Sequence, residues 1–215
     1  MASSYSAPDA AHDYVLGEVR AADRDRFLAA LFAPEPQRRG LLTLLALDHE
    51  LARTRAVTRE PMLARIRLEW WREAVAEAAG GGPPRAQPIV ESLSETVRRY
   101  RLPEREFGEL IDAREEEIEG ALDVVRAGHA LANLQLGVLG VTHEPTRAAA
   151  RAIGAAWLMG ECPERDALLV EARGHRAVID ARALPILLMA RLLDRSWTPW
   201  QKPLVLWWSA HRGRY

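Results

Sequence analysis

Residues 40–57 read GLLTLLALDHELARTRAV, and this stretch decides the fold class. Its leucines lie so close together that, on a helix of about 3.6 residues per turn, they cover most of the circumference. A helix that is apolar on nearly every side has to be surrounded by other elements. Residues 40–57 therefore predict the central helix of an all-α bundle.

The segments on either side have the three- and four-residue apolar spacing of further helices. There is no sustained alternation of apolar and polar residues and no Asn-Gly hairpin, so strands are not expected. The run Gly80–Pro84 predicts a flexible loop. We expect a flexible tail over 1–13 and a single helical domain over 14–215, with helices at about 14–32, 40–57, 61–79, 88–100, 104–128, 147–159, 164–176, 183–193 and 200–212.

Composition and motifs exclude several classes of function. The formal net charge is −1, so the chain as a whole does not attract nucleic acid. A single cysteine, Cys162, cannot form an internal disulfide. The scattered histidines form no His-Glu-x-x-His motif, and no Gly-x-Ser-x-Gly elbow occurs, which disfavours a zinc enzyme or a hydrolase. Because no long apolar run and no targeting signal is evident, we expect a cytoplasmic protein.

Two stretches of the chain resemble the squalene/phytoene synthase family. The more specific one contains RIRLEWWRE at Arg65–Glu73, and the other is the C-terminal LWWSAHRGRY. The matching segments are 25–28, 32–34, 38, 41–51 and 65–73 in the first stretch and 206–215 in the second, with 110–114 as a weaker third match. The resemblance implies an isoprenoid-synthase-like helical bundle around a central cavity, here shortened.

The resemblance also shows what is missing. Active members of the family join prenyl diphosphates with magnesium, which two aspartate-rich motifs hold. Where the first motif is expected, residues 52–56 read ARTRA, so that Arg53 and Arg55 would repel a cation. The expected place of the second motif, the helix over 147–159, contains no acid. We therefore expect no catalytic residue, no metal site and no cofactor, with magnesium relevant only if prenyltransferase activity remains.

One branch of the family shares this loss of aspartates and is similar to the mitochondrial assembly factor of NADH–ubiquinone oxidoreductase. That branch keeps a Glu-Leu-Ala like Glu50–Ala52 here. The resemblance favours a pseudoenzyme that acts as an accessory or assembly factor, with a respiratory-complex subunit or an assembly intermediate as partner. Two alternatives stay open: a prenyl diphosphate transferase with an atypical site, and a structural subunit of a larger complex.

The candidate binding residues follow from the same scaffold. For a prenyl substrate or lipid we expect Arg38, Glu50, Arg53, Arg67 and Trp71. For a protein partner, or for a peripheral contact with the inner membrane, we expect Trp207, Trp208 and Arg212.

Each of these features also has a purely structural interpretation. Adjacent residues on a helix point about 100° apart, so one tryptophan of each pair, Trp70–Trp71 and Trp207–Trp208, can face the core while the other lies at a rim. Arginines such as Arg67 can bind diphosphate or can pair with neighbouring carboxylates. The acids at 112, 115, 116, 119 and 123 can bind a cation, or they can form a solvated helix face beside arginines.

Overall fold

A computed structural model describes residues 7–57, 60–213 and 215. Within those residues the secondary structure is helical and contains no strand, which confirms the all-α prediction. The helices are α1 (Ala7–Ala22), α2 (Arg24–Ala30), α3 (Glu35–Val57), α4 (Pro61–Gly80), α5 (Pro88–Tyr100), α6 (Glu104–Glu116), α7 (Val124–Leu139), α8 (Glu144–Leu158), α9 (Pro163–Gly174), α10 (Leu184–Leu187), α11 (Met189–Leu193) and α12 (Gln201–His211), with short 3₁₀ turns at Arg176–Val178 and Ala181–Ala183.

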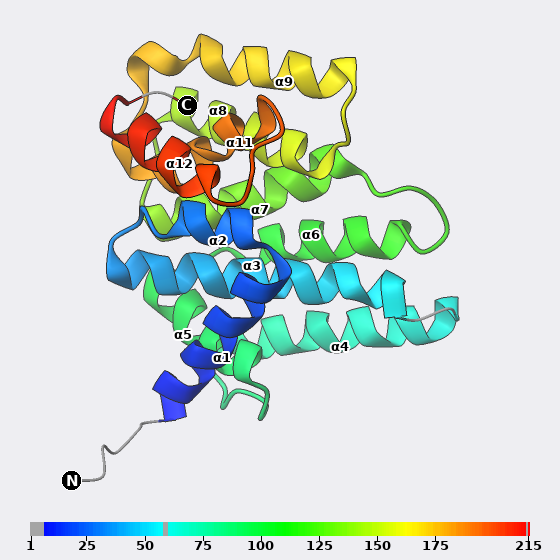
Figure 1. Cartoon of the computed structure of the whole chain (residues 1–215). Coiled ribbons are helices and arrows are strands. Elements are labelled where there is room, and N and C mark those ends of the chain that lie inside the picture. The colour runs from blue at the N-terminus through cyan, green and yellow to red at the C-terminus, as the bar shows by residue number, and fades with distance from the viewer. Residues whose placement is uncertain (1–6, 58–59, 214) are drawn as a thin grey trace, which may run out of the picture.

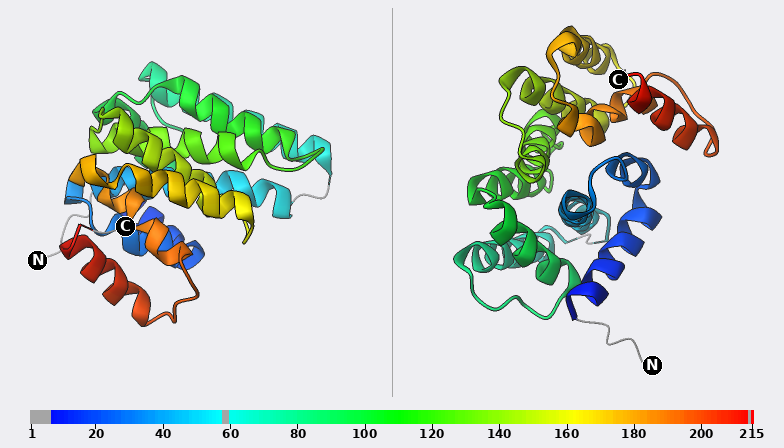
Figure 2. Two further views of the ribbon diagram at one scale, coloured as in Figure 1. Left: turned by 90° about the horizontal axis from the view of Figure 1, so that it is seen from above. Right: turned by 90° about the vertical axis from the view of Figure 1, so that its left-hand side faces the viewer.

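Helix α3 is the centre of the bundle, as its leucines predict. It packs against α1, α2, α4, α5, α6 and α7, and the right-hand view of Figure 2, which looks along α3, shows other helices around it. Leu42, Leu44 and Leu47 are fully buried on it. Helices α8 and α9 lie on the far side of α7 from α3 (Figure 1), and α10, α11 and α12 pack next to α2.

The N-terminal region differs from the prediction in two ways. Residues 7–13, expected in the flexible tail, form the first turns of α1, because Ala11 extends the buried stripe of Val15 and Val19 back by one turn. Residues 1–6 of that tail lie outside the described residues. The predicted helix over 14–32 is also interrupted at Asp23, whose side chain accepts a hydrogen bond from the Arg26 backbone N–H at 2.9 Å and so starts α2.

The predicted helix over 104–128 is likewise wrong as one element. Helix α6 ends at Glu116, and Asp123 caps a new helix by accepting the Arg126 backbone N–H at 2.9 Å. Helix α7 then runs through Gly128, which faces α8, and through Gly137, which faces Leu102. A side chain at Gly128 would lie 2.4 Å from the backbone nitrogen of Ala155, so the two backbones approach too closely for any larger residue.

Candidate functional site

A buried ion triad lies at the centre of the bundle, where α2, α3 and α6 meet. Asp48 on α3 is 1 % exposed. Its Oδ2 accepts a hydrogen bond from Arg26 Nη1 of α2 at 2.7 Å, and its Oδ1 accepts one from Arg114 Nη2 of α6 at 3.2 Å. One carboxylate of the central helix thus holds two neighbouring helices by buried charge-assisted hydrogen bonds.

The charges of the triad are balanced by further carboxylates. Arg26 Nε pairs with Asp23 at 2.5 Å, and Arg114 Nη1 pairs with Glu117 at 3.1 Å. Burial alone would raise the pKa of Asp48, but the positive charges of Arg26 and Arg114 outweigh it and lower that pKa below its usual value. Asp48 is therefore ionised at neutral pH, and both of its oxygens are engaged by arginines.

The cavity next to Arg26 of this triad is small. A cavity of about 10 Å³ lies next to Arg26, between Leu41, Gln135 and Met189. A single water needs roughly 10–15 Å³ of such volume, and small-molecule pockets usually measure about 300–1,000 Å³. This cavity holds no prenyl chain, so the large central cavity that the resemblance implies is not found at this place.

The expected place of the first metal motif is occupied by bonded arginines. Arg53 Nη1 donates to Glu50 Oε1 at 2.8 Å, and Arg55 Nη1 donates to the backbone oxygen of Ile118 at 3.1 Å. Asp48 and Glu50 share no partner, because they point away from each other on α3, as their two-residue spacing predicts. These residues therefore present no pair of carboxylates on one face.

The structure brings together three of the five residues expected to bind a substrate. Glu50 accepts from Arg53 and, through Oε2, from Arg67 Nη2 of α4 at 3.3 Å. Glu50 is mostly buried, whereas the two arginines are partly open to solvent. These three residues form an ion cluster, so the interpretation as paired charges explains them without a ligand.

The other two residues lie elsewhere. Arg38 is three turns nearer the start of α3 and donates from Nη2 to the backbone oxygen of Ala33 at 3.0 Å. Trp71 is 2 % exposed and packs edge-to-face on Trp70, with ring centroids 4.9 Å apart. Trp71 is therefore a core residue, and Trp70 lies at the rim under the Arg85 guanidinium, as the alternation within the pair predicts.

The acidic face of α6 is paired with arginines. Asp112 binds Arg72 at 2.9 Å and Arg126 at 3.1 Å, while Glu115 binds Arg72 and Glu116 binds Arg126. This agrees with the interpretation as a solvated face. Across 7–57, 60–213 and 215, no group of three or more His, Cys, Asp or Glu side chains is placed to hold a metal ion.

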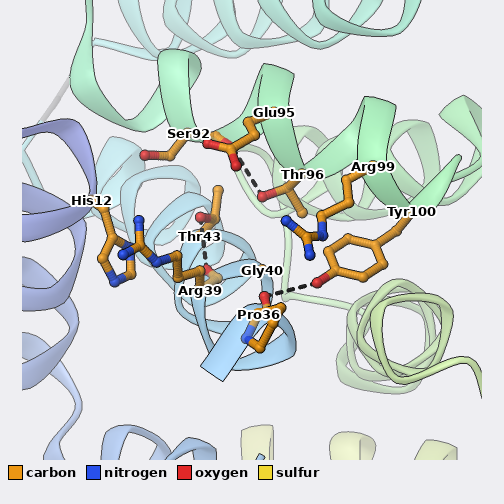
Figure 3. Close-up of a pocket in the computed structure, with 10 residues that line it drawn as sticks. All are labelled: His12, Pro36, Arg39, Gly40, Thr43, Ser92, Glu95, Thr96, Arg99 and Tyr100. Atoms are coloured by element: carbon orange, nitrogen blue, oxygen red, sulfur yellow. Dashed lines mark hydrogen bonds between the residues drawn. The ribbon is translucent and has the colours of Figure 1, made fainter. Parts of the chain in front are cut away.

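A small polar pocket that the sequence did not indicate lies between α1, α3 and α5 (Figure 3). His12 and Arg39 line one side, and Tyr100 closes the other by donating its hydroxyl to the backbone oxygen of Pro36 at 2.8 Å. Burial, followed by the charge of Arg39, lowers the pKa of His12, which keeps the imidazole neutral. With a volume of about 20 Å³, the pocket has room for a water but not for a substrate.

The residues expected to bind a partner lie together on α12. Trp207 and Trp208 are 62 % and 44 % exposed, so neither faces the core. The structural interpretation, in which one member of this pair faces the core, does not hold here, because Leu206 and Ser209 occupy the inward positions of α12. Trp207 stacks on His211, and the Arg212 guanidinium lies 3.9 Å over the Trp208 ring.

None of the helices that the structure describes is both long and apolar enough to cross a bilayer.

Comparisons with known proteins agree with this architecture. A sequence profile described as "Squalene/phytoene synthase" matches residues 19–160. A crystal structure titled squalene synthase HpnC from Alicyclobacillus acidocaldarius superposes with a TM-score of 0.69 at 14 % identity, covering 96 % of this chain and 95 % of that chain. At that identity the likeness shows the helical isoprenoid synthase fold. Because nearly all of both chains superpose, this chain is not shortened relative to that one.

Curated relatives carry a different name. The assembly factor 6 of NADH dehydrogenase (ubiquinone) complex I from Rattus norvegicus is 31 % identical over 118 residues, which are 55 % of this chain and 35 % of the relative. The Homo sapiens protein of the same name is 27 % identical over 106 residues, 49 % of this chain and 32 % of the relative. The match thus spans about a third of the length of these relatives.

Proposed function

This chain belongs to the squalene/phytoene synthase family, and we propose that it is a non-catalytic member that acts by binding a protein partner, as an accessory or assembly factor. The observation that carries the proposal is the buried triad of Arg26, Asp48 and Arg114, in which the acid of the central helix is held by two arginines. The cavity beside it is too small for a prenyl chain.

The physical case rests on charge. Departure of a diphosphate is promoted by magnesium ions that neutralise its oxygens, and carboxylates hold such ions. At the place of the first motif the chain has Arg53 and Arg55, and the nearby Glu50 is already shared by Arg53 and Arg67. A magnesium ion would have to displace these pairs and lie against fixed positive charge, which is unfavourable.

The choice of an assembly role rests on the curated relatives, which are named for the assembly of complex I. Because the match covers about a third of their length, the role of the whole relatives is part of the proposal. On this basis the partner is a subunit or an assembly intermediate of a respiratory complex. We place the protein in the cytoplasm, with a peripheral contact at the inner membrane.

The proposal that the protein is non-catalytic is tested directly by incubation with farnesyl or geranylgeranyl diphosphate and magnesium. We expect no release of inorganic diphosphate above a boiled control. Release that EDTA abolishes would contradict the proposal and would favour the alternative of a prenyl diphosphate transferase with an atypical site.

The proposal of a protein partner is tested by affinity purification of the full chain from its native cells under mild detergent. Substoichiometric recovery with a respiratory-complex intermediate, absent from the mature complex, supports an assembly factor. Recovery in fixed stoichiometry with a mature complex would contradict that role and identify a structural subunit.

A further inference from the structure

Helix α12 has large apolar side chains on its outward face. Trp200, at its N-cap, and Leu204, Trp207 and Trp208 are exposed and follow one another at the spacing of a single helix stripe. The helix lies at the edge of the bundle in both views of Figure 2. We call these four residues the α12 face.

The inward side of α12 is firmly attached to the bundle. Leu206 is fully buried and packs with Leu188 and Leu192. Lys202 Nζ pairs with Asp25 of α2 at 2.6 Å, and the Trp197 indole N–H donates to the backbone oxygen of Arg191 at 2.8 Å. The α12 face is therefore presented on a fixed element, and the exposure of its tryptophans is not a consequence of a loose terminus.

The segment that carries the α12 face is basic, and the Asp25 carboxylate of α2 beside it is paired with Lys202. From Arg195 to Tyr215 the sequence contains no Asp or Glu, although the whole chain is nearly neutral. The Arg195 guanidinium lies 3.9 Å over Trp197, and the Arg212 guanidinium lies 3.9 Å over Trp208. Neither arginine has a carboxylate partner among the described residues, so both charges are available to an external anion.

The nearest acid in the sequence does not change this balance. Asp194 binds both Arg173 and Arg191, so its charge is satisfied on the side of α9 and α11. Between Arg195, Leu204 and Trp207 the surface forms an open hollow of about 430 Å³, which is also lined by Arg191, Trp197, Val205 and Trp208.

Tryptophan and arginine together match one environment in particular. Indole rings are enriched where one end of the side chain is apolar and the other is wet, at the headgroup level of a bilayer. Basic residues next to them gain from the negative surface of anionic lipids. We propose that the α12 face docks on an anionic lipid bilayer, with Trp200, Leu204 and Trp207 entering the boundary between headgroups and acyl chains and Arg195 and Arg212 at the lipid phosphates.

A second copy of the chain fits the same face less well. A two-fold contact would place the α12 face against itself, so that the basic residues of the two copies would lie close together. Like charges without intervening acids oppose such a contact, whereas an anionic surface is complementary to them. The proposal rests on the peripheral membrane contact of the proposed function and deepens it, because it names the surface that makes this contact and the lipid chemistry that the surface recognises.

The apolar part of the proposal is tested by sedimentation of the full chain with vesicles of phosphatidylcholine alone or of phosphatidylcholine mixed with phosphatidylglycerol. We expect binding to the mixed vesicles and little to the neutral ones. The double variant Leu204→Ser with Trp207→Ser should lose at least about tenfold in binding, since both side chains would leave the interface. The matched control is Met62→Ser with Val170→Ser. It removes two apolar side chains on α4 and α9 that are at least as exposed as Leu204 and Trp207, and it should bind like the wild type.

The electrostatic part is tested by Arg195→Gln with Arg212→Gln. Two basic residues near an anionic surface are worth about a 20- to 30-fold change in binding, and the difference should shrink at high salt. The control Arg20→Gln with Arg105→Gln removes the same charge from exposed positions on α1 and α6 and should leave binding unchanged.

Three outcomes would overturn the proposal: no binding of the wild type to mixed vesicles, equal binding to neutral vesicles, or equal losses in the α12 and control variants. A concentration-dependent dimer that Trp207→Ser abolishes would identify a second copy as the occupant instead. Circular dichroism of each variant checks that the fold is kept. Failure of vesicle binding would remove the membrane contact alone. The results of the diphosphate-release assay and of the affinity purification would not change, so failure of this proposal can be told apart from failure of the non-catalytic or assembly role.

Discussion

The interior of this molecule contains buried charged side chains, whereas the α12 face at its surface is largely apolar. The interior holds a carboxylate between two arginines, Arg26–Asp48–Arg114, while the α12 face exposes tryptophans to solvent. Buried charge is costly unless it is fully paired, and exposed apolar area usually marks a contact surface. The difference supports the proposal that the centre of the bundle is a structural joint and that binding takes place at the surface.

The largest expected effect comes from breaking the triad. Asp48→Asn leaves Arg26 and Arg114 buried without a counter-charge, and removing one partner of such a group costs about 3–5 kcal/mol of the free energy of unfolding. Urea denaturation followed by circular dichroism measures it. The matched control is Asp112→Asn, which breaks partly exposed pairs with Arg72 and Arg126 and should cost no more than about 1 kcal/mol. Equal losses in both variants would show that the interior is no more dependent on charge than the surface.

Acid should remove the same contribution in the wild type. The pKa of Asp48 is lowered in the folded state below the ordinary value of 3.8, so the unfolded state takes up the proton first as pH falls. The stabilisation is therefore complete above about pH 5 and is lost as pH drops through 3.8 toward the lower folded-state pKa. Denaturation curves of wild type and Asp48→Asn should be separated by a constant amount between pH 5 and 8 and should converge below that range. Convergence near neutral pH would contradict the ionised triad.

The smallest expected effect concerns the exposed tryptophans. Trp207→Ala should change the free energy of unfolding by no more than about 0.5 kcal/mol, because the side chain contacts little of the bundle. Trp71→Ala, at the buried member of the other pair, should cost about 3–5 kcal/mol. Thermal unfolding of the two variants compares them directly. A large loss in Trp207→Ala would mean that α12 packs more closely than described and would weaken the assignment of a contact surface.

The central helix and the absence of the first aspartate motif could be predicted from the sequence, because both are local. The leucines of 40–57 determine the position of α3, and Arg53 and Arg55 are visible where acids are expected. The breaks before α2 and α7 were not predicted. The first is a single residue, Asp23, and the second, over 117–123, contains no proline to interrupt the helical pattern.

The site itself was harder to predict, because its partners are distant in sequence. Asp48 meets Arg26 and Arg114 across 22 and 66 residues, a relation that no periodicity encodes. The available signal was an acid among the leucines of a helix expected to be central, because a buried carboxylate needs a counter-charge. The exposure of Trp207 and Trp208 also depends on tertiary packing, because Leu206 and Ser209 face the bundle instead.

The most direct measurement of the central claim is a calorimetric titration of the full chain with farnesyl diphosphate, with and without magnesium. If two arginines hold Asp48 and the cavity next to Arg26 measures only about 10 Å³, magnesium has no site there and should produce no additional binding heat. Saturable binding that depends on magnesium and disappears with EDTA would contradict the account and would show that the centre of the bundle still opens to a diphosphate.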